Sequence, residues 1–260
     1  MTTTPLISRY HTTPGMQTLF GTLLPSVSFY LKLTATIFAA ASSAKNGRYN
    51  DAAWAASSGK VLTSLEQSGV GFDVSGLEHI SGLNEPGVII GNHMSMMETL
   101  VLPNLILPFT QATFVIKESL LDYPVFKHIM RSRNPVAVTR SNPRADLKTV
   151  MTEGVERVKN NISVIVFPQT TRSTEFDMKS FSSIGIKLAK RAGCPVIPLA
   201  LKTDAWTNGS LLKDFGRLSP QKEARFAFGE PLHVQGKGQE EHLQVMRFIE
   251  DKLNSWKDTA

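Results

Sequence analysis

A short apolar run leads into the start of a helix in the stretch Val88-Ile89-Ile90-Gly91-Asn92-His93-Met94-Ser95-Met96-Met97-Glu98. Val88–Gly91 is apolar and mostly β-branched, which is typical of a buried strand. Ser95 followed three residues later by Glu98 is a capping box, so we expect a helix to begin at Met96. A strand, a short turn and a helix in this order form the building unit of an α/β fold.

The same alternation continues on both sides of this stretch, from about residue 70 onward. Residues 144–159 and 243–256 carry apolar side chains at steps of three or four, which predicts amphipathic helices. We therefore expect an α/β fold with a mostly parallel central sheet of about seven strands, flanked by helices. The expected strands are residues 72–75, 88–91, 113–116, 136–139, 162–167, 196–201 and 225–228.

Composition excludes several classes of protein. The 260 residues are 42% hydrophobic and 19% charged, which fits a globular core and excludes collagen, a coiled-coil rod and a disordered chain. The lone cysteine, Cys194, excludes an internal disulfide and a multi-cysteine metal site. The net charge of +6 favours an anionic partner. No nucleic-acid-binding motif accompanies this charge, so we expect no nucleic-acid partner.

The N-terminal region is basic and apolar. No acidic residue precedes Asp51, and the longest apolar segment, residues 19–41, is interrupted by Pro25 and Lys32. We expect a helix, broken near Pro25, that lies in or dips into a membrane surface. The alternatives are a helix packed on the protein's own core and a helix that spans the membrane. The chain is thus expected to divide into a helical membrane-associating region, 1–69, and an α/β domain, 70–260.

His93 is expected in the turn between the strand and the helix. Ligands of parallel sheets bind beyond the carboxyl ends of the strands, so a histidine there is well placed to act as a general base. Glu98, in the first helical turn, could bind one imidazole nitrogen, fix the tautomer and stabilise the imidazolium. The alternative is that Glu98 only caps the helix and that His93 is an ordinary loop residue.

Two further strand ends carry residues that suit an anion. The turn Phe167-Pro168-Gln169-Thr170-Thr171-Arg172-Ser173 contains hydroxyls, an amide and a guanidinium, which could bind a phosphate together with backbone N–H groups. Arg140 and Arg144 follow the strand expected at 136–139. Each turn could equally be a solvated polar loop, and we expect Arg144 to be solvated.

Taken in order, these residues resemble the lysophosphatidate acyltransferase family, the PlsC-type glycerolipid acyltransferases. The resemblance covers roughly residues 70–232 and includes Lys117, which resembles a family lysine that follows the next strand. Glu98 stands in place of the family's Asp, and Gln169 and Thr170 replace its Glu and Gly. These changes affect the identity of the acceptor more than the type of reaction. The matching blocks are Asn92-His93 with Glu98, Val138-Thr139-Arg140, Phe167 to Ser173, and Val196-Ile197-Pro198-Leu199.

The resemblance implies a 1-acyl-sn-glycerol-3-phosphate O-acyltransferase-like enzyme of phospholipid biosynthesis. It would move a fatty acyl group from acyl-CoA or acyl-carrier protein to a hydroxyl of lysophosphatidate or another lysolipid. His93 would act as general base and Glu98 would orient it, without a covalent intermediate, a metal or a cofactor. Lys117 or backbone N–H groups would stabilise the oxyanion or bind the donor. The residues expected to bind the acceptor phosphate are Arg140, Gln169, Thr170, Thr171 and Arg172.

Such an enzyme would work on membrane lipids, as a peripheral or monotopic protein on the cytoplasmic face of the inner or plasma membrane. A second reading is a catalytically silent lipid-binding protein on the same fold. The altered pair Gln169-Thr170 favours the silent protein, whereas His93 and the carboxylate at position 98 favour the enzyme.

Overall fold

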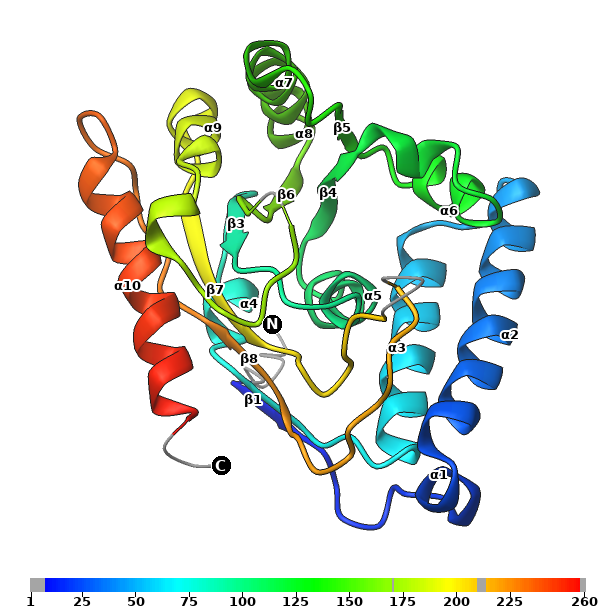
Figure 1. Ribbon diagram of the computed structural model, residues 1–260. Helices are drawn as coiled ribbons and strands as arrows, with labels where there is room; N and C mark the ends of the chain where they lie inside the picture. The colour runs from blue at the N-terminus through cyan, green and yellow to red at the C-terminus, as the bar shows by residue number, and fades with distance from the viewer. Residues whose placement is uncertain (1–7, 170, 210–213, 258–260) are drawn as a thin grey trace, which may run out of the picture.

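The computed structural model describes residues 8–169, 171–209 and 214–257 and shows a sheet between two layers of helices (Figure 1). The sheet has eight strands in the order β1-β2-β8-β7-β3-β6-β4-β5. All neighbouring strands are parallel except β1 with β2 and β7 with β8. The strands are β1 (Arg9–His11), β2 (Phe72–Ser75), β3 (Val88–Gly91), β4 (Gln111–Lys117), β5 (Val136–Val138), β6 (Ile162–Val166), β7 (Val196–Lys202) and β8 (Ala224–Phe228).

This topology confirms the predicted α/β class with a mostly parallel sheet. All seven expected strands are present to within two residues at each end. The additional strand is β1, which has only three residues, two of them exposed, and so carries no strand pattern in the sequence.

The helices are α1 (Leu19–Leu23), α2 (Pro25–Lys45), α3 (Asp51–Gln67), α4 (Glu78–Ser81), α5 (Met97–Ile106), α6 (Phe126–Ser132), α7 (Pro143–Thr149), α8 (Val155–Lys159), α9 (Ile184–Ala192) and α10 (Gln239–Ser255). Two 3-10 turns, η1 (Glu118–Leu121) and η3 (Met178–Ser180), and one π turn, η2 (Val150–Gly154), complete the elements. The helix expected over 144–159 is therefore α7, η2 and α8 in succession. Its predicted apolar stripe is buried or partly buried throughout.

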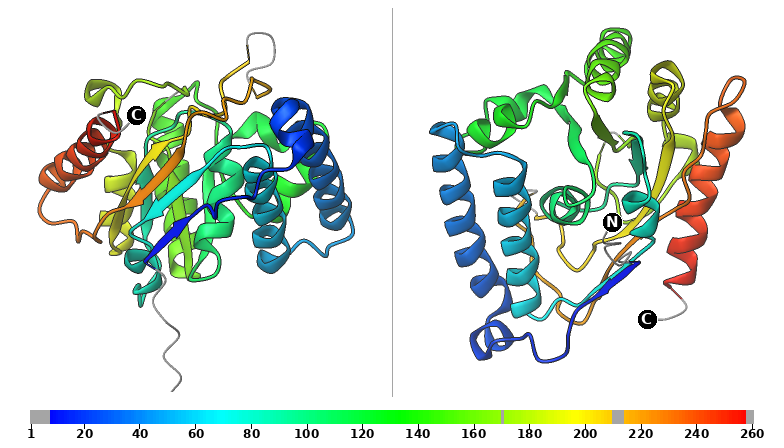
Figure 2. Two further views of the ribbon diagram at one scale, coloured as in Figure 1. Left: turned by 90° about the horizontal axis from the view of Figure 1, so that it is seen from below. Right: turned by 180° about the vertical axis from the view of Figure 1, so that it is seen from behind.

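Alternate residues of the central strands enter two cores, one on each face of the sheet. In β3, Ile89 packs with α3 and α5, whereas Val88 and Ile90 pack with α9 and α10. Figure 2 shows α2, α3 and α5 on one side of the sheet and α9 and α10 on the other. The buried stripe of α10 is Val245, Ile249 and Leu253, and the expected Leu243 is instead exposed.

The apolar N-terminal segment is broken at Pro25, as expected, into α1 and α2. Its packing agrees with the core-packed alternative on one face only. One face of α2 is buried through Phe29 and Leu33, while Leu31 and Phe38 on another face are 62% and 58% exposed. By length and composition α2 is also apolar enough to cross a membrane.

The boundary expected between residues 69 and 70 does not separate two packing units. β1 belongs to the sheet, and Phe29 of α2 and Leu65 of α3 share one core with Ile89 of β3. Trp206, just after β7, donates a hydrogen bond of 3.0 Å from its indole nitrogen to the Tyr30 hydroxyl of α2. Residues 8–69 therefore contribute to one of the two cores that cover the faces of the sheet.

We predict that Phe29→Ala lowers the free energy of unfolding by about 3–5 kcal/mol, because it leaves a cavity in the core under α2. The matched change Leu31→Ala, on the exposed face of the same helix, should change it by less than about 0.5 kcal/mol. Denaturant unfolding in a mild detergent measures both. Equal effects would mean that α2 does not pack as described.

Candidate active site

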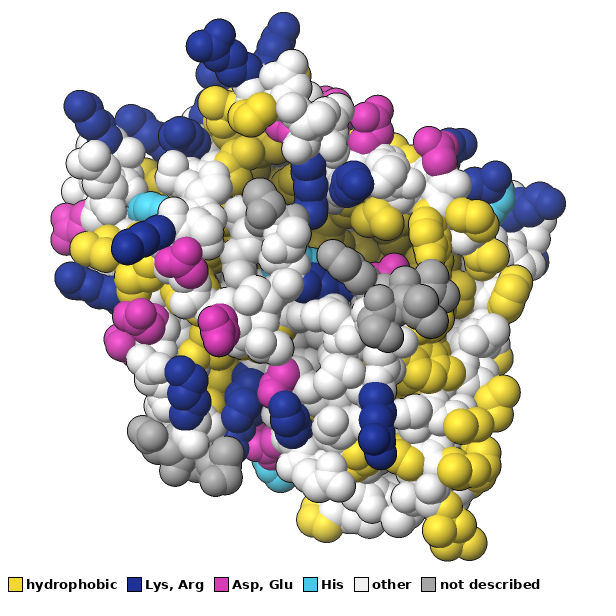
Figure 3. Space-filling view, viewed as in Figure 1, with side chains coloured by type: hydrophobic (Ala, Val, Ile, Leu, Met, Phe, Trp, Pro, Cys, Tyr) yellow, Lys and Arg dark blue, Asp and Glu magenta, His cyan; other side chains and the backbone are white. Residues whose placement is uncertain are grey.

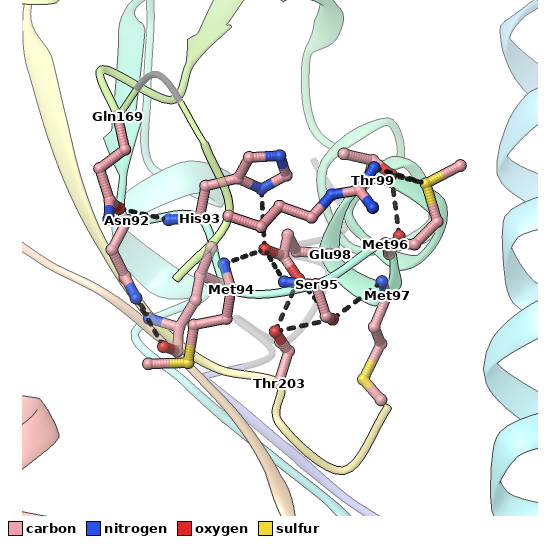
Figure 4. Close-up of polar contacts among 12 residues, drawn as sticks. Asn92, His93, Met94, Ser95, Met96, Met97, Glu98, Thr99, Gln169 and Thr203 are labelled. Atoms are coloured by element: carbon pink, nitrogen blue, oxygen red, sulfur yellow. Dashed lines mark hydrogen bonds and ion pairs between the residues drawn. The ribbon is translucent and has the colours of Figure 1, made fainter. Parts of the chain in front are cut away.

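The predicted His93–Glu98 pair is formed. His93 Nδ1 lies 2.9 Å from Glu98 Oε1, and the two residues are 7% and 0% exposed (Figure 4). His93 lies in the turn that follows β3, and Glu98 lies in the first turn of α5. Because His93 and Glu98 are close in sequence, the end of one strand and the start of the next helix are enough to bring the two side chains together.

Glu98 also binds backbone N–H groups at the start of its helix, so it does more than cap the helix. Glu98 Oε1 accepts hydrogen bonds from the backbone N–H groups of Met94 at 2.7 Å and Ser95 at 2.9 Å. Ser95 Oγ in turn accepts from the Met97 N–H at 3.1 Å. The half of the predicted capping box in which Glu98 accepts from the Ser95 N–H is thus present, whereas Ser95 accepts from Met97. The helix α5 begins at Met97, one residue later than expected.

The hydrogen bonds to Glu98 determine its ionisation. Burial raises the pKa of Glu98, but hydrogen bonds from His93, Thr203 and Ser95 and the charge of His93 outweigh burial and lower it below 4.5. An ionised carboxylate can only accept hydrogen bonds, so His93 Nδ1 carries a proton. In the neutral imidazole the lone pair is then on Nε2, which points away from Glu98 (Figure 4).

Phe167, at the end of β6, covers one face of the imidazole. The two rings are parallel, with 4.6 Å between their centroids and 4° between their planes. An imidazolium at this distance is attracted to the electron-rich face of the phenyl ring. Phe167 therefore packs flat against the His93 ring and restrains its plane.

The backbone around His93 is held by two neighbouring segments. Asn92 Nδ2 donates to the Leu201 carbonyl and Asn92 Oδ1 accepts from the Leu201 N–H, both at 2.8 Å, so one side chain extends the β3–β7 pairing. Gln169 Oε1 accepts from the His93 N–H at 2.7 Å, and the Ser173 N–H donates to the His93 carbonyl at 2.9 Å. The turns after β3 and β6 are thereby joined.

The two arginines expected at the site lie near each other. Removal from solvent and the positive charge of Arg172 lower the pKa of Arg140, while Asp146 opposes both effects. Arg140 has a left-handed backbone with φ of 62°, and Asp146 holds it by accepting from the N–H groups of Thr139 and Arg140 at 2.8 Å each. Arg172 Nη1 forms an ion pair of 2.6 Å with Asp214.

The remaining expected residues are placed as follows. Lys117 is exposed at the end of β4 and lies opposite Val138, two residues before Arg140. Thr171 is exposed in the turn after β6, and Thr170 lies outside the described residues. Because β3, β4, β5, β6 and β7 are mutually parallel, their carboxyl ends meet at one edge of the sheet.

A hollow opens over β4 and β6 in the face shown in Figure 3. Hydrophobic side chains form its walls, and Lys or Arg side chains and a histidine lie within it or at its rim. Within the described ranges, no three His, Cys, Asp or Glu side chains gather as a metal site requires.

Sequence patterns did not indicate several residues that complete the site. They are Asn92 as a backbone clamp, Phe167 as a stacking partner, and Ser95, Thr203 and Asp214 as side chains that bind site residues. The structure brings Thr203 and Asp214 to the site from the chain after β7, far from His93 in sequence. No local spacing connects such residues, so only the topology of the sheet could have found them.

Together, the fold and the site define an α/β protein with a buried His–carboxylate pair at the carboxyl edge of a parallel sheet, which suits general-base chemistry. The family model described as Acyltransferase matches residues 71–202, just over half of the chain, and the chain belongs to that family. This finding confirms the resemblance to the PlsC-type acyltransferases.

Known proteins agree with this assignment. The chain is 33% identical to the 1-acyl-sn-glycerol-3-phosphate acyltransferase of Pseudomonas aeruginosa over 66% of this chain and 63% of that protein. It is 30% identical to the protein of the same description from Cocos nucifera, over 49% of this chain and 42% of that protein. The matched segments thus span less than two thirds of both relatives.

A solved structure shares the fold. The 1-acyl-sn-glycerophosphate acyltransferase PlsC from Thermotoga maritima superposes with a TM-score of 0.65 and 22% identity, over 90% of this chain and 95% of that one.

We predict that Glu98→Gln lowers the free energy of unfolding at neutral pH by about 1–3 kcal/mol, because the charge-assisted hydrogen bonds are lost. Since folding depresses the pKa of Glu98 below 4.5, its stabilisation is complete above that pH and is lost as the pH falls through the folded pKa. Denaturant unfolding at several pH values should show the difference between the two proteins narrowing below pH 4.5. Glu250→Gln, at an exposed position of α10, is the control and should have little effect at any pH.

Proposed function

We propose that the protein transfers a fatty acyl group from an acyl thioester, acyl-CoA or acyl-carrier protein, to a hydroxyl of lysophosphatidate or another lysolipid. The observation that carries the proposal is the buried His93–Glu98 pair, at 2.9 Å, in a chain of the Acyltransferase family. No cofactor and no metal enter this reaction.

In the proposed mechanism His93 Nε2 takes the proton of the acceptor hydroxyl as the hydroxyl oxygen attacks the thioester carbonyl. Glu98 holds the ring through Nδ1 and stabilises the imidazolium, which also lies over Phe167. The imidazolium then returns its proton to the departing thiolate. Lys117 or backbone N–H groups donate to the oxyanion that forms on the carbonyl oxygen.

Direct attack by the acceptor is supported by the burial of two protein nucleophiles, Cys194 and Ser95. Cys194 is buried in the core on the other face of the sheet, and burial raises the pKa of its thiol to about 11. The Ser95 hydroxyl is 1% exposed and lies within hydrogen-bond distance of Glu98 and Thr203. Neither group is placed to form an acyl-enzyme.

Acceptor binding is proposed at the turns after β5 and β6, through Arg140, Arg172, Thr171 and Gln169. An acceptor phosphate would replace the Asp214 carboxylate on Arg172, because both anions bind a guanidinium in the same way. Gln169 Oε1 is bound to the His93 N–H, which leaves the amide nitrogen to donate to the acceptor. The hydrophobic hollow in Figure 3 suits an acyl chain.

The relatives favour lysophosphatidate as the acceptor, since those from Pseudomonas aeruginosa and Cocos nucifera are described as 1-acyl-sn-glycerol-3-phosphate acyltransferases. Because Gln169 and Thr170 differ from the family pattern, other lysolipids are also candidate acceptors.

Membrane attachment is proposed through the exposed face of α1 and α2. This face carries large exposed apolar side chains and an apolar groove that includes Tyr30, Leu31 and Phe38. Because the opposite face of α2 packs on the core, we propose that the helix lies in one leaflet on the cytoplasmic side and does not cross the membrane. The exposed side chains are Leu19, Phe20, Leu23, Leu24, Val27, Leu31 and Phe38.

The first test is acyl transfer measured by mass spectrometry, with acyl-CoA or acyl-carrier protein and a panel of lysolipids. His93→Ala should lower kcat by about 10²–10⁴-fold, because the general base is lost, and should still unfold in one cooperative transition. His128→Ala, in α6, is the control and should keep full activity.

Activity retained by His93→Ala would refute the mechanism. No product from any donor and acceptor, with lipid still bound, would favour the catalytically silent lipid-binding protein.

The second test replaces exposed apolar side chains of α1 and α2. The triple change of Leu23, Leu31 and Phe38 to Ser should release the protein from sedimenting phospholipid vesicles, since each side chain contributes about 1.5–3 kcal/mol when buried in lipid. Leu243→Ser, on the exposed face of α10, is the control and should not affect sedimentation. Point changes are used because removing residues 1–45 would also remove β1 and the core residue Phe29.

A further inference from the structure

We propose that Thr203 is a positioning residue that holds the Glu98 carboxylate, and through it the His93 ring, in the reactive orientation. This inference rests on the proposed function of the site. Thr203 directly follows β7, is 0% exposed, and its Oγ1 donates to Glu98 Oε2 at 2.6 Å (Figure 4).

Thr203 is the contact that anchors the carboxylate to the sheet. Glu98 Oε1 accepts from His93, Met94 and Ser95, which all belong to the same turn and would move together with it. Oε2 accepts from Thr203, which stands at the end of a different strand. A carboxylate fixed at one oxygen can still rotate, so the bond to the second oxygen fixes the plane in which His93 Nδ1 must lie.

Ser95 does not supply this bond by itself. Its hydroxyl oxygen lies 3.0 Å from both Glu98 Oε2 and Thr203 Oγ1, and it accepts from the Met97 N–H. A hydroxyl has one proton, so Ser95 can donate to only one of the two oxygens at a time. Thr203, at the shorter distance of 2.6 Å, is the stronger donor to Glu98.

The end of β7 thus contacts the His93 turn at two points. Asn92, before His93, is bound to the backbone of Leu201 through both amide atoms. Glu98, after His93, is bound to the side chain of Thr203 two residues further along the same strand end. These two attachments set the distance between the His93 backbone and its carboxylate partner.

The test compares three threonine variants. Thr203→Val keeps the branched shape and removes the donor, so kcat should fall about 10–100-fold, as for a small misplacement of a catalytic group, with KM for donor and acceptor within about twofold. Thr203→Ser restores a donor and should recover kcat to within about threefold of the wild type. Thr113→Val is the matched control, because Thr113 is also buried and donates at 2.7 Å to the Arg133 carbonyl.

A second measurement does not depend on activity. In protein labelled with ¹⁵N-histidine, the His93 signals are identified by their loss in His93→Ala. The wild type should show a single tautomer with the proton on Nδ1, and Thr203→Val should show a mixture of tautomers. If Thr203→Val does not unfold in a cooperative transition, Thr203→Ala is used in its place, because it removes the same donor. Its kcat and its His93 tautomer are then measured.

Unchanged kcat together with an unchanged His93 tautomer in the variant without the donor would overturn the proposal. An equal loss of kcat in Thr113→Val would also overturn it, since the effect would then be general to buried threonines. If the wild type transfers no acyl group, the proposed function fails, and the tautomer measurement alone decides whether Thr203 positions the pair.

Discussion

Glu98 is a charged group fully removed from solvent, and it stays ionised there because polar groups surround it. Its two oxygens accept from the imidazole, from two backbone N–H groups and from the Thr203 hydroxyl. An isolated buried carboxylate would take up a proton, and the His93 tautomer would no longer be defined. The turn after β3, the start of α5 and the end of β7 are therefore all constrained by one side chain. The arrangement of this edge of the sheet follows from satisfying that charge.

The polar groups of the site are rigid because each is attached to a different element. Asn92 fixes its turn to β7, Gln169 fixes the same turn to the segment after β6, and Asp146 fixes the left-handed backbone of Arg140 after β5. Parallel strands place these turns at one edge, and the side chains then join them. Arg172 differs from these residues, since its partner Asp214 is another charged, partly exposed side chain that an anionic ligand can replace.

Most of the fold was predictable because the buried strands are continuous β-branched runs and the helices keep their apolar period. The His93–Glu98 pair was predictable for a similar reason, since the six residues from His93 to Glu98 in one strand–turn–helix unit contain the whole geometry. Sequence could not identify Thr203 or Asp214, which reach the site only through the order of the strands. Nor could it show that α2 has one buried and one exposed apolar face, because the same apolar residue types occur on both. Leu243 was misassigned because α10 carries more apolar positions than its core contact uses.

The order of the strands has a consequence for synthesis on the ribosome. β1 and β2 connect to the rest of the sheet through β8, whose residues are made about 150 positions later. At bacterial or eukaryotic rates of translation this delay is on the order of ten seconds. During that interval α1 and α2 have left the ribosome but lack part of their core, including Trp206. The nascent chain therefore presents its long apolar helix α2 to the cell before the sheet can close, which gives a membrane the opportunity to receive it cotranslationally.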